Sequence, residues 1–307
     1  MKTTFVKLLW LMCALLAQAV PACAQEESPV TMEGSPVTTE GSPVSAIFKK
    51  ATRPNLRSGI ALIYDEQGQQ PLYAKGADSV APIASITKLM TAMVVLDARL
   101  PMDEKITLSR QDEDHYKGSR SRMRSGMTLA RGDLLKLALM ASENRAAAAL
   151  ARTFPGGAEA VVALMNFKAR ALGMKDTHFI DPTGLHSGNV STAQDLVKLV
   201  LAAQRYENIQ QATTSTSHVV DVGGSRQMHF RNTNPLVRNA SWDIGLSKTG
   251  YISEAGRCLV METRISQRPV VIVLLDSWGK RTRIGDANRI RHWMESSLIR
   301  PSAIRRG

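Results

Sequence analysis

Ser85 and Lys88 are three residues apart at the start of a segment, residues 86–98, whose apolar spacing predicts a helix. Positions i and i+3 share a helix face, so the hydroxyl and the amine can meet. A serine becomes a nucleophile when a base takes its proton, and a lysine can be that base if burial and nearby cations lower its pKa. The free N–H groups at a helix N-terminus also favour developing negative charge. The spacing therefore indicates a serine nucleophile with a lysine base.

The same spacing also has a simpler interpretation, in which Ser85 caps the helix and Lys88 is solvated. The chain contains a second example, because Ser277 and Lys280 are also three residues apart. That pair follows an apolar run and encloses Gly279, so we interpret it as a turn.

Ser142 and Asn144 lie where the helical pattern of residues 133–152 is interrupted. A hydroxyl and a carboxamide two residues apart at such a break can both point into a cleft. Ser187 and Asn189 form a rival pair, but they follow Asp181 in a loop rich in Gly and Pro, where turn formation explains them. We therefore prefer Ser142 and Asn144 as the functional pair.

Lys248, Thr249 and Gly250 follow the apolar run 242–246 and are predicted to lie on a strand. A glycine on a strand lets a ligand approach the backbone closely. A cation beside a hydroxyl suits a substrate that ends in a carboxylate. The alternative for this tripeptide alone is a solvated lysine on an edge strand.

The elements that must position these residues follow an order of strands, then helices, then strands. A domain with strands at both ends and a helix-rich middle is predicted to be α+β, with its terminal segments sharing one antiparallel sheet. The apolar patterns predict strands at residues 58–64, 71–74, 258–265 and 270–275, and helices at 86–98, 133–152, 165–172, 192–203 and 286–296.

Taken together and in this order, the three motifs resemble those of the active-site serine DD-peptidases, the low-molecular-mass penicillin-binding proteins. The likeness runs from about residue 55 to residue 295 and is greatest to the D-alanyl-D-alanine endopeptidases of this family. It implies a β-lactamase/DD-peptidase-like fold, in which the sheet packs with a helical region, and a hydrolase without metal or cofactor. The segments that carry it are 84–91, 142–147, 181–185 and 246–251.

The resemblance also implies a role for each motif residue. Ser85 would be acylated, Lys88 would accept its proton, and Ser142 would relay a proton to the leaving amine. Lys248 would lower the pKa of Lys88, and the backbone N–H groups of Ser85 and Tyr251 would form the oxyanion hole. The residues implied to bind the substrate are Asn144, Lys248, Thr249, Gly250 and Tyr251.

Differences between this sequence and the related β-lactamases and carboxypeptidases indicate which activity to expect. We find no Glu-x-x-Leu-Asn segment between the second and third motifs, where class A β-lactamases keep their deacylating glutamate, so a bound penicillin is expected to leave slowly. Glu143 replaces a glycine common in the carboxypeptidases, and residues 298–307 are expected to be too short and broken for a second domain or a membrane helix. Both points favour an endopeptidase that cuts D-alanyl–diaminopimelate cross-links. The carboxypeptidase is the alternative.

The N-terminal residues predict export to the periplasm. Residues 1–24 combine a basic start, a short apolar run and Ala22-Cys23-Ala24, which is typical of a cleaved signal peptide; lipidation at Cys23 is a minor alternative. Residues 25–52 contain a seven-residue repeat and are expected to be a linker, and 53–307 the catalytic domain. Loss of Lys2 and Lys7 would lower the net charge from +12 to +10. Cys258 would then remain alone, as a buried apolar residue on a strand.

Other functional classes fit the sequence less well. The six histidines are scattered and no zinc-ligand spacing occurs, which disfavours a metal hydrolase. The basic run 119–124 is interpreted as a solvated loop, and export makes nucleic acid an unsuitable partner. The expected partners are cross-linked peptidoglycan peptides and, as covalent inhibitors, β-lactams, with no membrane segment after signal cleavage. The remaining alternative is a catalytically weak protein that binds the cell wall through its charge.

Overall fold

The antiparallel sheet predicted from the two ends of the chain is present in the computed structural model, which describes residues 43–222 and 226–303. Its five strands follow the order β2-β1-β11-β10-β9, and each neighbouring pair is antiparallel. The central strand β11 thus joins an N-terminal hairpin to two late strands, with Ile60 opposite Leu275. The strands are β1 (Ile60–Asp65), β2 (Gln70–Lys75), β9 (Asp243–Ile252), β10 (Gly256–Ile265) and β11 (Arg268–Ser277).

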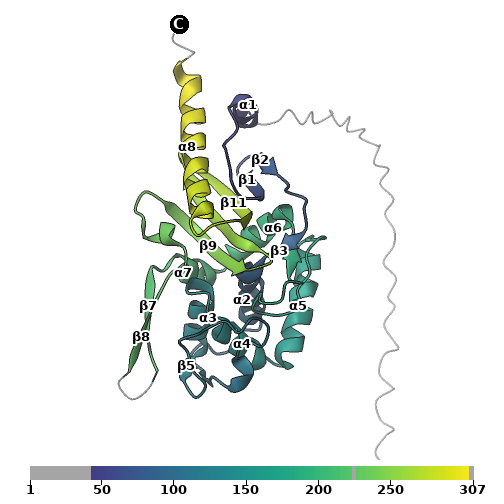
Figure 1. Ribbon diagram of the computed structural model, residues 1–307, viewed down its shortest axis with the longest axis vertical. Helices are drawn as coiled ribbons and strands as arrows, with labels where there is room; N and C mark the ends of the chain where they lie inside the picture. Colours follow the sequence, from purple (N-terminus) through teal and green to yellow (C-terminus); the bar gives the residue numbers. More distant parts are fainter. Residues whose placement is uncertain (1–42, 223–225, 304–307) are drawn as a thin grey trace, which may run out of the picture. The chain divides into compact units, whose positions relative to one another are not determined.

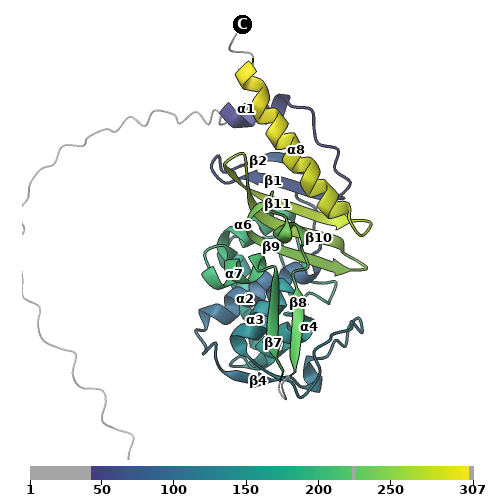
Figure 2. The same ribbon diagram turned by 90° about the vertical axis from the view of Figure 1, so that its left-hand side faces the viewer.

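Both faces of this sheet are buried, because helices cover each side (Figures 1 and 2). Alternate residues of a strand point to opposite faces. Ile60 and Leu62 of β1 accordingly pack into the larger core with the helical region, whereas Ala61 and Ile63 pack into a second core. The second core is closed by α1 (Pro43–Lys50) and the C-terminal helix α8 (Thr282–Ala303).

The larger core is built around α2, whose buried residues run from Lys88 to Val95. Helix α6 packs between α2 and the sheet, and the other helices surround α2. This helical region comprises α2 (Lys88–Asp97), α3 (Arg131–Met140), α4 (Asn144–Arg152), α5 (Gly157–Ala171), α6 (Ala193–Ala203) and α7 (Glu207–Thr214). Short 3₁₀ turns and strands join these helices: β3 (Ala81–Pro82), η1 (Ala84–Thr87), β4 (Lys105–Thr107), η2 (Arg110–Asp112), β5 (Thr128–Ala130), β6 (Val190–Ser191) and η3 (Pro235–Arg238).

Several predicted elements differ from those observed. The helix predicted at 86–98 begins as the 3₁₀ turn η1 before α2, and the segment 133–152 forms two helices, α3 and α4, with the break at Ser142. Helix α5 begins eight residues before the predicted start at 165. Helix α8 continues to Ala303, so residues 298–303 are helical rather than broken. The hairpin of β7 (Ser217–Asp221) and β8 (Gln227–Arg231) was not predicted, because each strand buries only one residue.

The folded part of the chain begins earlier than residue 53. Residues Pro43–Lys50 were expected to belong to the linker, but they form α1. Phe48 of this helix is buried, and its ring lies 4.7 Å from that of Trp293. Ser42-Pro43-Val44 reads as a third copy of the repeat, which hides the helical spacing of Val44, Ile47 and Phe48. The predicted signal peptide and residues 25–42 of the predicted linker lie outside the described residues.

Within residues 43–222 and 226–303, no helix combines the length and the apolar character needed to cross a bilayer.

Candidate active site

Ser85 and Lys88 meet at the junction of η1 and α2, as their spacing predicts. The Lys88 Nζ lies 2.8 Å from Ser85 Oγ, 2.7 Å from Asn144 Oδ1 and 2.6 Å from the carbonyl oxygen of Thr183. Two of these partners are carbonyl oxygens, which only accept hydrogen bonds, whereas the serine hydroxyl can also donate. A neutral Lys88 amine would therefore keep two donated bonds and direct its lone pair at Ser85.

Burial favours this neutral form of Lys88. The side chain is 1% exposed, and desolvation lowers its pKa from 10.5 to about 7, against the opposing effect of Asp181, Glu143 and Asp114. Removal from water disfavours the charged form of an amine. Near neutral pH a substantial fraction of Lys88 is thus able to accept a proton.

A second serine–lysine pair lies across the cleft from the first. Lys248 on β9 donates a 2.8 Å hydrogen bond to Ser142 Oγ and another of 2.8 Å to the carbonyl oxygen of Thr249. Ser142 lies between α3 and α4 with φ +59°, a left-handed conformation that costs a non-glycine residue about 1 kcal/mol. This conformation turns the chain sharply between two helices, which is where the sequence predicted an interruption.

The charges of the two lysines act on each other. Burial is the largest cause of the lowered pKa of Lys88. The pKa of Lys248 is lowered well below its usual value by burial first, then by the charges of Lys88 and Arg283. Because repulsion between two cations is mutual, a charged Lys248 also disfavours a charged Lys88, and its effect on the pKa of Lys88 stays a prediction.

Two glycines let other segments approach the backbone around Ser85. A Cβ at Gly250 would lie 2.9 Å from the carbonyl oxygen of Ile83 and 3.1 Å from the Ser85 nitrogen. A Cβ at Gly184, whose φ is +80°, would lie 2.0 Å from the carbonyl oxygen of Ala84. We predicted that Gly250 admits a ligand to the backbone; in the structure it admits η1, the protein's own nucleophile-bearing turn. These contacts hold Ala84 at φ +48°, another left-handed residue.

Asn144 connects Lys88 to the loop that follows η2. Its Oδ1 accepts from Lys88, and its Nδ2 donates a 2.9 Å hydrogen bond to Ser119 Oγ. The neighbouring Glu143 accepts a 2.7 Å bond from Ser121 Oγ, and burial raises the pKa of this carboxyl. Both ends of the Asn144 amide are thus occupied, so contact with a substrate backbone would require release of Ser119.

The remaining predicted substrate-binding residues lie on β9. The Thr249 side chain is buried and donates a 2.6 Å hydrogen bond to Thr233 Oγ1. The Tyr251 ring is 57% exposed, and the Arg257 guanidinium lies 4.5 Å from its centroid. The structure therefore brings the motifs of Ser85, Ser142 and Lys248 together. They lie at the edge of the sheet, where β9 meets η1 and the start of α4.

The rival motifs have structural roles instead. Asn189 is fully buried, donates to Thr87 Oγ1 and to the carbonyl oxygen of Asp181, and accepts from two backbone N–H groups. These hydrogen bonds hold in place the loop that contains Thr183, whose carbonyl oxygen accepts a hydrogen bond from Lys88. Ser277 is buried and lies 2.7 Å from Ser58 Oγ, next to the exposed Trp278.

Arg283 is a residue that sequence reasoning missed. It lies in the first turn of α8, is 8% exposed, and lowers the pKa of Lys248 through its charge. Its Nε and Nη1 atoms are buried without a hydrogen-bond partner in the described part of the chain. A buried guanidinium with unused donors thus adds positive charge near Lys248. No sequence pattern points to Arg283, because it belongs to no motif and lies 35 residues after Lys248.

Cys258 takes no part in this site. It is fully buried on β10, and burial raises the pKa of its thiol to about 12. It is inert as a nucleophile at neutral pH, in agreement with the prediction of a buried apolar residue.

An antiparallel sheet packed against helices, with two serine–lysine pairs at its edge, defines the architecture of the active-site serine peptidases. The chain belongs to the D-alanyl-D-alanine carboxypeptidase family, whose model matches residues 47–279. This confirms the family and the α+β fold predicted from the motifs.

Curated relatives and solved structures agree with this membership. The chain is 49% identical to a D-alanyl-D-alanine endopeptidase of Pseudomonas aeruginosa over 80% of this chain and 79% of the relative. It is 47% identical to one of Escherichia coli, over 82% and 81%. The Streptomyces K15 DD-transpeptidase superimposes with a TM-score of 0.74 at 27% identity, covering 80% of this chain and 99% of that one.

Proposed function

We propose that this protein is a periplasmic serine DD-endopeptidase that hydrolyses D-alanyl–diaminopimelate cross-links of peptidoglycan through an acyl-enzyme on Ser85. The observation that carries the proposal is the contact between Ser85 Oγ and a buried Lys88 whose pKa is about 7. The names of the relatives that share most of this chain support the endopeptidase.

The proposed reaction has two halves. Neutral Lys88 takes the Ser85 proton as Oγ attacks the carbonyl carbon of D-alanine, and the backbone N–H groups of Ser85 and Tyr251 stabilise the oxyanion. Ser142 relays this proton from Lys88 to the amine that leaves when the C–N bond breaks, and Lys248 orients the Ser142 hydroxyl. Water then attacks the ester, which frees Ser85 and releases a D-alanine carboxylate.

The positive side of the site suits the charge of the substrate. Lys248 is buried on β9, the charge of Arg283 acts on it, and Arg283 has buried donors without a partner among the described residues. A substrate carboxylate beside these groups would gain charge-assisted hydrogen bonds. Asn144, Thr249 and Gly250 would contact the peptide backbone in the same cleft.

Covalent labelling by a fluorescent penicillin tests the serine mechanism. The wild type is expected to be labelled stoichiometrically, to release the label slowly, and to lose labelling in Ser85→Ala. A folded wild type that takes up no label would overturn the enzyme and leave the wall-binding alternative.

The products from cross-linked muropeptides distinguish the two peptidase activities. The endopeptidase predicts conversion of dimers to monomers that keep intact tetrapeptides. Trimming of pentapeptides without loss of dimers would instead identify a carboxypeptidase, the activity for which the family is named.

We propose the periplasm as the site of action because residues 1–24 have the pattern of a signal peptide. Fractionation of cells that express the full chain, with N-terminal sequencing of the product, tests this. Recovery from the cytoplasm with Met1 intact would contradict export.

A further inference from the structure

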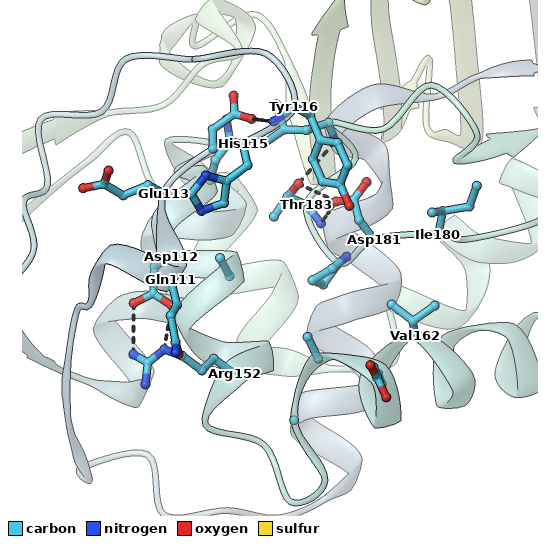
Figure 3. Close-up of a pocket in the computed structure, with 18 of the residues that line it drawn as sticks. Gln111, Asp112, Glu113, His115, Tyr116, Arg152, Val162, Ile180, Asp181 and Thr183 are labelled. Carbon is cyan, nitrogen blue, oxygen red and sulfur yellow. Dashed lines mark hydrogen bonds and ion pairs between the residues drawn. The ribbon is translucent and has the colours of Figure 1, made fainter.

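A cavity of about 690 Å³ is lined by two of the hydrogen-bond partners of Lys88. Asn144 and Thr183 line it, and both give an oxygen to Lys88 Nζ. Its other walls come from the segment 111–116 and from the first two turns of α5, residues 157–163 (Figure 3). The cavity is therefore continuous with the reacting centre but contains neither serine.

The lining of this cavity combines an apolar wall with negative charge. Val162, Ala163 and Ile180 supply apolar surface, with Ile180 41% exposed. In Figure 3, Val162 and Ile180 lie on the opposite side of the cavity from the ion pair of Asp112 and Arg152.

The acidic groups outnumber the one arginine of the lining. Asp112 is neutralised by Arg152, Glu113 lies 3.2 Å from Arg145, and backbone and side-chain donors bind Asp181. Glu159 is exposed on α5 and has no ion pair or hydrogen bond within the described residues. The lining of the cavity thus carries a net negative charge, and Asn144 and Thr183 connect it to Lys88.

We propose that this cavity binds an aliphatic side chain with a free ammonium group, carried by the cross-linked peptide whose scissile bond lies at Ser85. The apolar wall packs the methylene chain, and Glu159 with the other carboxylates attracts the ammonium. This inference rests on the proposed function, because the peptide is its substrate.

Adjacent positions on α5 give a matched test by binding. Ala163 lines the cavity and is exposed, so Ala163→Trp can fill the cavity without disturbing the core; Leu164 is 41% exposed and does not line it. We expect the Kd of a purified cross-linked muropeptide dimer for the Ser85→Ala protein to rise at least about tenfold with Ala163→Trp. Leu164→Trp is expected to leave it unchanged, and circular dichroism checks folding.

Charge selection is tested with Glu159→Gln and an N-acetylated dimer. The exposed carboxylate predicts a two- to fivefold weaker affinity for the free-amine dimer in Glu159→Gln, and no change for the acetylated one. An unchanged Kd in Ala163→Trp, no binding by the Ser85→Ala protein, or equal affinity for both dimers would each overturn the cavity proposal. Penicillin labelling of Ala163→Trp with Ser85 intact separates the two proposals: normal labelling keeps the serine mechanism even if the cavity fails.

Discussion

Lys88 lowers the pKa of Lys248 through its charge, although each ammonium hydrogen-bonds a different serine. Two buried amines so placed do not both carry a proton at low cost. The site therefore holds fewer positive charges near neutral pH than its residue types suggest.

Acylation is expected to depend on the titration of Lys88. Its pKa of about 7 means that the neutral, proton-accepting form is lost as the pH falls through that value. The second-order rate constant for acylation by a penicillin should fall about tenfold per pH unit below 6 and reach a plateau above about 8. Stopped-flow measurement between pH 5 and 9 checks this. A rate that stays constant across that range would contradict a lysine base.

Ser142→Ala should lower acylation about 10²- to 10³-fold while leaving the fold intact, because the proposed mechanism relays a proton through this hydroxyl, which accepts a hydrogen bond from Lys248. Ser187→Ala is the matched control from the rival Ser-x-Asn pair and should leave the rate within about twofold. Labelling rates and thermal unfolding of both variants provide the comparison. Equal losses in the two variants would remove Ser142 from the mechanism.

Gly250→Ala should disturb η1, because the added Cβ would meet the backbone of Ile83 and Ser85. We expect a loss of about 1–3 kcal/mol in the free energy of unfolding and a large loss of labelling. Gly285 lies inside α8, where the nearest atom to an added Cβ is the Arg289 side chain at 3.5 Å. Gly285→Ala should instead stabilise the protein by up to about 1 kcal/mol. Denaturant titration measures both, and wild-type labelling by Gly250→Ala would argue against the close contact.

Lys117 and Glu254 form an ion pair that joins the loop after η2 to the turn between β9 and β10. The pair holds the pKa of Glu254 down at about 2. Both side chains are partly exposed, so the pair contributes little to stability, but its release should open the cleft to a large substrate. Lys117→Ala and Glu254→Ala should each raise dimer cleavage by up to about fivefold, and the double variant should add nothing more. Additive effects would show that the two residues act separately.

Glu262 lies on β10, outside the candidate active site, and we expect it to make the stability of the protein depend on pH. Burial raises the pKa of this carboxyl to about 7, with further contributions from Glu66 and Asp243 and an opposing one from Arg264. The folded state then binds more protons than the unfolded one, so stability falls as the pH rises from about 4.5 to 7. Glu262→Gln should remove this fall and stabilise the protein at pH 8 by about 1–2 kcal/mol, allowing for solvent screening. Parallel stability curves for the two proteins would contradict the shift.

The contacts within the candidate site could be predicted from the sequence where their spacing is short and local. Ser85 with Lys88, and Ser142 with Asn144, each lie within one turn, and the pairing of the terminal strands followed from their apolar runs. The junctions between segments could not be predicted in this way. Gly184 packs against the backbone of Ala84, and Asn189 donates a hydrogen bond to Thr87, which lies 102 residues earlier in the chain. Neither contact has a local sequence pattern.

Arg283 and the cavity beside α5 were missed for a related reason. The cavity exists only because the segment 111–116 and the start of α5 meet near Thr183, so no single segment encodes it. α1 was missed because its helical spacing overlaps the last copy of the repeat.

The position of β11 between β1 and β10 has a consequence for how the chain reaches its native state. Ile60 pairs with Leu275, more than two hundred residues later, so the centre of the sheet forms only by closing a very long loop. Pairings of such sequence separation slow folding. The sheet that carries Lys248 cannot be completed until residues 268–277 have been synthesised, and the chain stays open for most of its synthesis, the state in which a polypeptide can still be threaded across a membrane.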